Sequence, residues 1–128
     1  MPDDDAFQLD STYVFLHDGG QATRMPGGPA FWATIGERKL AEGWLVTRYT
    51  MHEDWPHWEM HPEGEELVSL ISGRVTMLLD DGARQWQVEM GSGQTIVNQR
   101  GTWHRALVHE PSDMLFVTAG RNTQHRPK

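Results

Sequence analysis

The chain has 128 residues, no cysteine and a formal net charge of -7 with its histidines neutral. The length suits a single domain with a buried core, and the absence of cysteine excludes disulfides, thiolate nucleophiles and thiolate metal sites. The acidic balance argues against nucleic acid and against a membrane surface as partners, because both select basic proteins.

The sequence of the N-terminal part of the chain predicts little regular structure beyond one strand. Residues 11–16 are β-prone, 25–29 are predicted to be a loop, 31–35 fit either a short strand or a cover over a pocket, and 36–43 form the one plausible helical turn. Thirteen glycines and seven prolines indicate many tight turns. This composition favours a β-rich fold over a helical bundle.

From residue 44 onward the pattern becomes regular, with β-prone or alternating segments separated by short turns. The predicted strands cover residues 44–51, 57–61, 65–72, 74–79, 83–90, 94–98, 103–109 and 114–119. Short strands repeated every 8–12 residues or so are typical of an all-β sandwich or small barrel. Residues 121–128 are polar and are predicted to be a flexible tail.

The densest group of potential metal ligands lies between His57 and Glu66, where ten residues contain two histidines and four glutamates. On an extended strand residues 57, 59 and 61 share one face, because side chains alternate. Glu66 begins an apolar strand, and it lies on the same inward face as every second residue of that strand. The neighbouring Glu65 points outward. A third histidine, His104, lies on a later predicted strand.

Two segments resemble the motifs of the cupin superfamily. In the first motif, His61 is followed by four residues, Glu66, six residues and Gly73, as in cupins, but Glu59 occupies the slot of the first histidine. His57 shares the parity of Glu59 and would replace it if the strand carried a bulge. In the second motif Gly93, Gly101 and His104 match, while Gln99 and Val108 stand where cupins have proline and asparagine.

This resemblance covers about residues 44–120 and implies a double-stranded β-helix, or cupin jelly roll, of six to eleven strands. It also implies a bound divalent metal ion, with Glu59, His61, Glu66 and His104 as ligands. Two histidines with one or two carboxylates suit Fe, Mn, Ni or Zn. We therefore predict an N-terminal arm over 1–43 that packs on or swaps with the barrel, a cupin barrel over 44–120, and the tail over 121–128.

The tryptophans and one arginine give further expectations. Trp44, Trp86 and Trp103 lie in predicted strands and are expected in the core, whereas Trp32, Trp55 and Trp58 flank loops near the proposed site and are candidates to line a pocket. On the strand before the first motif, either Arg48 or Tyr49 must face inward, and an outward Arg48 is the expectation.

Two classes of function follow from these residues. The first is a small metal-dependent enzyme of dioxygenase, isomerase or lyase type that acts on a small polar or anionic molecule, with Glu59 as the candidate catalytic base. The second is a non-catalytic sensing or ligand-binding module, similar to the zinc-binding cupin of anti-sigma factors.

We also expect a homodimer in which residues 13–16 pair onto a sheet edge. An acidic N-terminus and the lack of cysteine favour a cytoplasmic protein.

Overall fold

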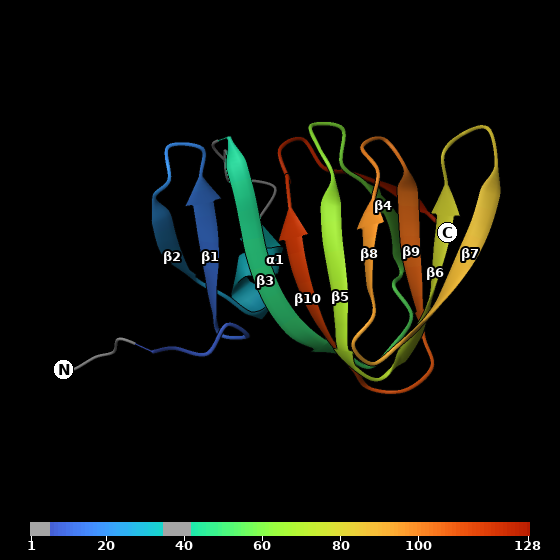
Figure 1. Cartoon of the computed structure of the whole chain (residues 1–128), viewed down its shortest axis with the longest axis horizontal. Coiled ribbons are helices and arrows are strands. Elements are labelled where there is room, and N and C mark those ends of the chain that lie inside the picture. The colour runs from blue at the N-terminus through green and yellow to red at the C-terminus, as the bar shows by residue number, and fades with distance from the viewer. Residues whose placement is uncertain (1–5, 35–41) are drawn as a thin grey trace.

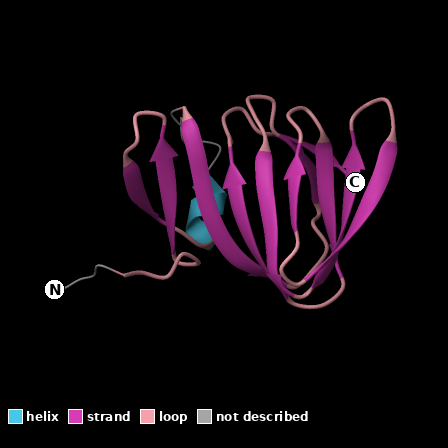
Figure 2. Ribbon diagram, viewed as in Figure 1, coloured by secondary structure: helices cyan, strands magenta, loops and turns pink. Residues whose placement is uncertain are grey.

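The computed structural model describes residues 6–34 and 42–128, and strands dominate this part of the chain (Figure 2). The elements are β1 (Thr12–His17), β2 (Ala22–Pro26), α1 (Pro29–Thr34), β3 (Gly43–Met51), β4 (His57–Met60), β5 (Glu66–Ser72), β6 (Arg74–Asp80), β7 (Gln85–Gly91), β8 (Thr95–Asn98), β9 (Trp103–Val108), β10 (Ser112–Thr118) and β11 (Gln124–Pro127). No helix of the described chain could span a membrane.

The strands form two antiparallel sheets (Figure 1). One sheet has six strands in the order β2-β1-β3-β10-β5-β8, and the other has five in the order β11-β4-β9-β6-β7. Strands that are distant in sequence lie next to each other, as when β10 pairs with both β3 and β5. This interleaving of early and late strands is the topology of a jelly roll, so the predicted fold class is confirmed.

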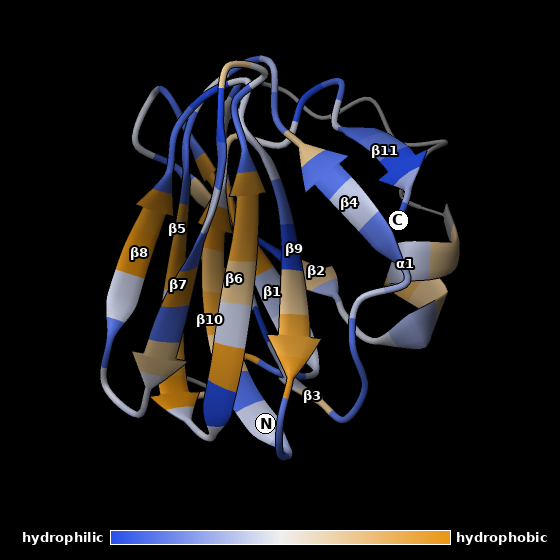
Figure 3. Cartoon of the chain, turned by 90° about the vertical axis from the view of Figure 1, so that its right-hand side faces the viewer, coloured by the Kyte–Doolittle hydropathy of each residue, from blue (hydrophilic) through white to orange (hydrophobic). Residues whose placement is uncertain are grey.

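The main core lies between the two sheets, where alternate side chains of each strand point inward. Its buried members are Trp55, Val68, Leu70, Val75, Met77, Met90, Ala106, Met114 and Phe116. Figure 3 shows the corresponding hydrophobic stretches on β5, β6 and β10, in contrast to the hydrophilic β4 and β11. Polar strands at one end of a packed barrel are where a binding site can form without disturbing the core.

The N-terminal part extends the six-stranded sheet, because β1 pairs with β3 of the same chain and β2 pairs with β1. The loop predicted over 25–29 is therefore partly a strand. Residues 29–34 form helix α1 and not the short strand considered for 31–35. Pro29 occupies the first helical position, where the missing N–H costs nothing. The helical turn expected over 36–43 lies mostly outside the described residues.

The C-terminal residues differ from the predicted flexible tail, because residues 124–127 form strand β11 and pair with β4. The guanidinium of Arg126 lies over the rings of Trp58 and Trp103, 4.9 Å and 4.6 Å from their centroids. It also forms an ion pair of 2.6 Å with Asp80. Cation–π contacts and an ion pair thus fix a segment whose sequence has no apolar pattern.

Candidate metal centre

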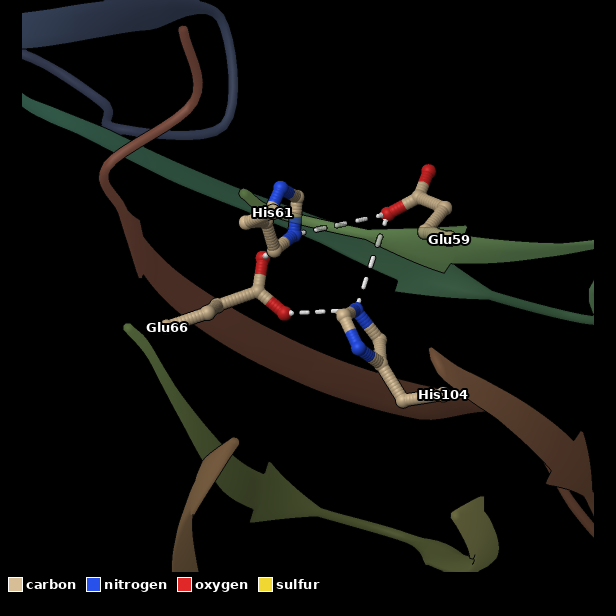
Figure 4. A group of neighbouring side chains, drawn as sticks. All are labelled: Glu59, His61, Glu66 and His104. Carbon is tan, nitrogen blue, oxygen red and sulfur yellow. Dashed lines mark ion pairs between the residues drawn. The ribbon is translucent and has the colours of Figure 1, made fainter. Parts of the chain in front are cut away.

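Four side chains that the sequence singles out lie together where the two sheets face each other (Figure 4). Glu59 is on β4, His61 follows that strand, and His104 is on β9, where it pairs directly with Glu59. Glu66 begins β5 in the opposite sheet. One potential ligand atom from each residue lies within 4.8 Å of all the others. We call these four residues the His/Glu cluster.

The cluster is tightest around Glu66, whose side chain is only 4% exposed. Its Oε2 lies 3.2 Å from Nε2 of His61, and its Oε1 lies 3.1 Å from Nε2 of His104. Glu59 is more distant, with Oε1 at 4.0 Å from His61 Nε2 and 3.9 Å from His104 Nε2. Its side chain is 33% exposed, so the cluster has a buried interior and one accessible side.

Hydrogen bonds behind the two histidines turn both Nε2 atoms toward the cluster. The hydroxyl of Thr123 donates to the carbonyl of Gly120 at 2.9 Å, so it accepts from Nδ1 of His61 at 2.8 Å. Nδ1 of His104 donates to the carbonyl of Thr102 at 3.2 Å. In the neutral form of each ring the proton is therefore on Nδ1, which leaves the Nε2 lone pair free for a metal.

The two Nε2 atoms are buried and have no hydrogen-bond partner among residues 6–34 and 42–128, although a Glu66 oxygen lies close to each. With both rings neutral, acceptor lone pairs would face carboxylate oxygens, which is unfavourable unless a cation lies between them. The donor set of two imidazole nitrogens and carboxylate oxygens suits Fe, Mn, Ni or Zn. The residues therefore fit a divalent metal ion.

Glu66 is held by two donors from its own sheet. Thr118 donates its hydroxyl to Oε2 at 2.7 Å, and the amide of Asn98 donates to Oε1 at 3.3 Å. Burial by itself raises the pKa of Glu66, but His104 and His61 outweigh it and hold that pKa well below the usual range. The carboxylate is therefore charged in this environment, as a metal ligand must be.

The pKa of His104 is shifted in the opposite direction. Burial lowers it, and this is the largest single effect, but the negative charges of Glu66 and Glu59 together raise the pKa above its ordinary value. The buried cluster thus attracts positive charge, and that charge can be a proton or a metal ion. Protons and metal are expected to compete for the same nitrogen atoms.

His125 is the nearby residue that sequence reasoning missed, since it lies in the segment predicted to be a flexible tail. It pairs directly with Glu59 across β11 and β4, and its Nε2 lies 3.4 Å from Glu59 Oε2. Glu59 raises the pKa of His125 by this contact. His57, the alternative ligand, is exposed and lies outside the His/Glu cluster. Only the register of β11 reveals the role of residue 125.

A cavity of about 1330 Å³ adjoins the cluster, and Glu59, His61 and Glu66 form part of its wall. Its aromatic side is made by Tyr13, Trp32, Tyr49 and Phe116, and polar groups come from Arg121, Asn122, Thr123 and His125. Tyr49 stacks on Phe116 with a centroid distance of 5.0 Å. The pKa of Tyr49 is raised well above its ordinary value, mainly by burial and further by the negative charges of Glu59 and Glu66. Its phenol therefore stays neutral.

Comparison with known proteins establishes the fold. No protein-family model matches the sequence, and no curated protein matches it. A solved structure from Klebsiella pneumoniae, described as an uncharacterized conserved protein with a double-stranded beta-helix domain, matches with a TM-score of 0.57 and 20% identity over 71% of this chain and 80% of that one. This chain has the double-stranded β-helix fold of the cupins.

Two further matches show how broadly this fold is used. A conserved protein of unknown function from Streptococcus pyogenes matches with a TM-score of 0.50 and 22% identity, over 66% of this chain and 69% of that one. Hydroquinone 1,2-dioxygenase PnpCD, in complex with Cd2+ and 4-hydroxybenzonitrile, matches with a TM-score of 0.51 and 15% identity. The match covers 62% of this chain and 59% of the dioxygenase chain.

The protein therefore has the double-stranded β-helix fold, and its buried cluster of histidines and glutamates offers a set of ligand atoms close enough together to hold a metal ion. Within the cluster, Glu59 stands where the motif has its first histidine, and its partner His125 comes from outside both motifs. Similarity of fold does not establish function, so the chemistry of this site depends on these residues.

Proposed function

We propose that this cupin is a metal-dependent enzyme that acts on a small organic molecule held in the cavity beside the His/Glu cluster. The observation that carries the proposal is the pair of buried Nε2 atoms, on His61 and His104, that point at charged carboxylates and lack hydrogen-bond partners within the described part of the chain. A cluster that served only to stabilise the fold would be expected to satisfy these atoms.

The metal, when bound, would supply Lewis acidity and open coordination positions toward the cavity. The other contributions come from the chain. Glu66 is nearly buried and is fixed by Thr118 and Asn98, which suits it to hold the ion. Glu59 is the group suited to proton transfer, because it is partly exposed and faces both the cluster and the cavity. We propose Glu59 as the general base.

The cavity supports a substrate with two unlike ends. Its polar end would lie against the His/Glu cluster, near the polar side chains of Thr123 and Asn122. Its apolar part would lie against Trp32, Tyr49 and Phe116, which favour a flat or bulky hydrocarbon portion. Two glutamates offset the charge of a divalent ion, so a neutral or singly anionic polar group is compatible with the site.

Metal analysis of protein purified without chelator tests the proposal first. His61→Ala and His104→Ala are each expected to lose the ion, whereas His52→Ala, which changes an exposed loop histidine, is expected to retain it. Full retention in both cluster variants would remove the metal site. Turnover of small organic acids, β-diketones or catechols by the loaded wild type, lost in Glu59→Gln, is the further expectation. Tight metal binding without any turnover would favour a binding or sensing module.

A further inference from the structure

The C-terminal residues 121–127, here called the C-terminal strap, are attached to the barrel by polar and cation–π contacts, among them ion pairs of Arg121 with Glu42 and of Arg126 with Asp80. Strand β11 forms one edge of its sheet and pairs only with β4 over four residues. The turn before it contains Asn122 with a φ of 59°, and its amide donates to Glu63 at 3.2 Å. Arg126 supplies the main anchor, on Trp58 and Trp103. Strand β11 is mostly exposed, and edge elements with little buried apolar surface open more readily than the core does.

One contact of the strap reaches His61. The Thr123 hydroxyl can donate only one proton and gives it to Gly120, which leaves its oxygen to accept from Nδ1 of His61. Thr123 therefore fixes both the orientation of the His61 ring and the nitrogen that carries the proton. Without it, the neutral ring would be free to place its proton on Nε2 and so block the nitrogen that faces the cluster.

A second contact reaches Glu59. Nε2 of His125 lies 3.4 Å from Oε2 of Glu59, the oxygen that points away from the cluster. The other oxygen, Oε1, faces His61 and His104. One carboxylate is thus held between the strap and the cluster, with one oxygen for each. Because Glu59 is the most exposed cluster residue, it depends most on such support for a defined orientation.

We propose that Thr123 and His125 are positioning residues for the metal site, and that docking of the C-terminal strap is coupled to metal binding. This inference rests on the proposed metal site. Loss of a group that orients a metal-binding histidine typically weakens affinity about 10- to 100-fold. Coupling is reciprocal, so a bound metal should suppress opening of the strap by the same factor by which loss of the strap weakens metal binding.

The role of Thr123 is tested with Thr123→Val, which keeps the side-chain shape and removes the hydroxyl, and with Thr123→Ser, which restores it. Thr95→Val is the matched control, since it removes an exposed hydroxyl contact to Ser69, between β8 and β5 of the other sheet. We expect Thr123→Val to bind Zn(II) about 10- to 100-fold more weakly, and the other two variants to bind it as the wild type does.

A second readout uses metal-free protein and so does not depend on zinc. In nitrogen-15 NMR spectra, the Nδ1–H of His61 should be protected from solvent exchange in the wild type and in Thr123→Ser. It should be lost in Thr123→Val. A general loss of structure would move many other signals, whereas loss of this contact moves those of one ring. An Nδ1–H signal that is unchanged in Thr123→Val would overturn the assignment of Thr123.

Trypsin measures opening of the strap directly, because cleavage after Arg121 releases residues 122–128, while the bond from Arg126 to Pro127 resists the enzyme. We expect saturating Zn(II) to slow this release about 10- to 100-fold when opening is fast relative to cleavage. Arg126→Ala leaves Thr123 and His125 in place but removes the anchor. It should speed the release and weaken zinc binding together.

Several outcomes would overturn the coupling. Equal zinc affinity in Thr123→Val and in the wild type would refute the role of the strap and leave the proposed function intact. Release of the peptide at the same rate with and without zinc would also refute the coupling. Failure of the wild type to bind Zn(II), Co(II), Mn(II) or Fe(II) would refute the proposed function and the coupling together, and the NMR measurement would still decide the role of Thr123.

Discussion

Replacing Glu66 with glutamine should reverse the way in which the stability of the metal-free protein depends on pH. In the wild type the charges of Glu66 and Glu59 raise the pKa of His104 above its ordinary value, against the effect of burial. A histidine with a raised pKa stabilises the folded state below about pH 6.5, and this contribution is lost as the pH rises through the raised value. The free energy of unfolding should therefore fall with rising pH.

The size of this effect follows from the number of protons involved. One histidine that binds a proton in the folded state but not in the unfolded state gives a slope of at most about 1.4 kcal/mol per pH unit. In Glu66→Gln the main charge that holds the proton is gone, and burial becomes the dominant influence on the pKa of His104. The pKa then falls below its ordinary value, so stability should rise with pH up to about pH 6.5.

Urea unfolding of chelator-treated protein between pH 5.5 and 8.5 measures both slopes. His125 also has a raised pKa because of Glu59, but it contributes the same downward slope in both proteins. The difference between the two curves therefore reports the effect of the Glu66 charge within the His/Glu cluster. If the Glu66→Gln protein lost stability with the same slope as the wild type, Glu66 could not be the charge that raises the pKa of His104.

Three further predictions concern the fold and the assembly. Gly73 has a φ of +108°, and a Cβ added there would lie 2.7 Å from Cα of Ser112. Gly73→Ala should therefore lower the free energy of unfolding, measured in urea, by about 2–5 kcal/mol. Gly82→Ala is the matched control: φ is +91° with open space around it, and it should cost about 1–2 kcal/mol. The pKa of Asp80 is lowered, first by Arg126 and then by the N–H of Gly82. The ionised Asp80 therefore stabilises the fold, and this stabilisation should be lost as the pH falls through the lowered pKa. In an acid titration, Arg126→Ala should lose less stability over this range than the wild type does. The predicted homodimer should appear in light scattering at micromolar concentration, and a monomer there would contradict it.

The regular half of the fold and the cluster could be predicted because their signals are local. Alternation along residues 57–61 places Glu59 and His61 on one face, and the apolar strand that follows fixes the direction of Glu66. The spacing of the second motif was enough to predict that His104 belongs to the cluster. The expectation for the strand before the first motif also holds, because Tyr49 faces the cavity and Arg48 points outward to Asp113.

The remaining features depend on contacts that are distant in sequence. The strap has no apolar periodicity, and Arg126 attaches it to two tryptophans from different strands. Trp44 was expected in the core but is 39% exposed, because it lies on β3 with its side chain away from the inner face. Trp55, a candidate to line the pocket, is instead buried in the core against the ring of His104. A tryptophan in a β-prone sequence fits either environment.

The placement of Glu66 has a mechanical consequence. It is the only member of the His/Glu cluster in the six-stranded sheet; Glu59 and His104 belong to the five-stranded sheet. An ion bound by all of them would act as a non-covalent cross-link between the two layers of the barrel. Separation of the layers would then require the ion to leave, so the rate at which it dissociates would set an upper limit on how fast the barrel can split.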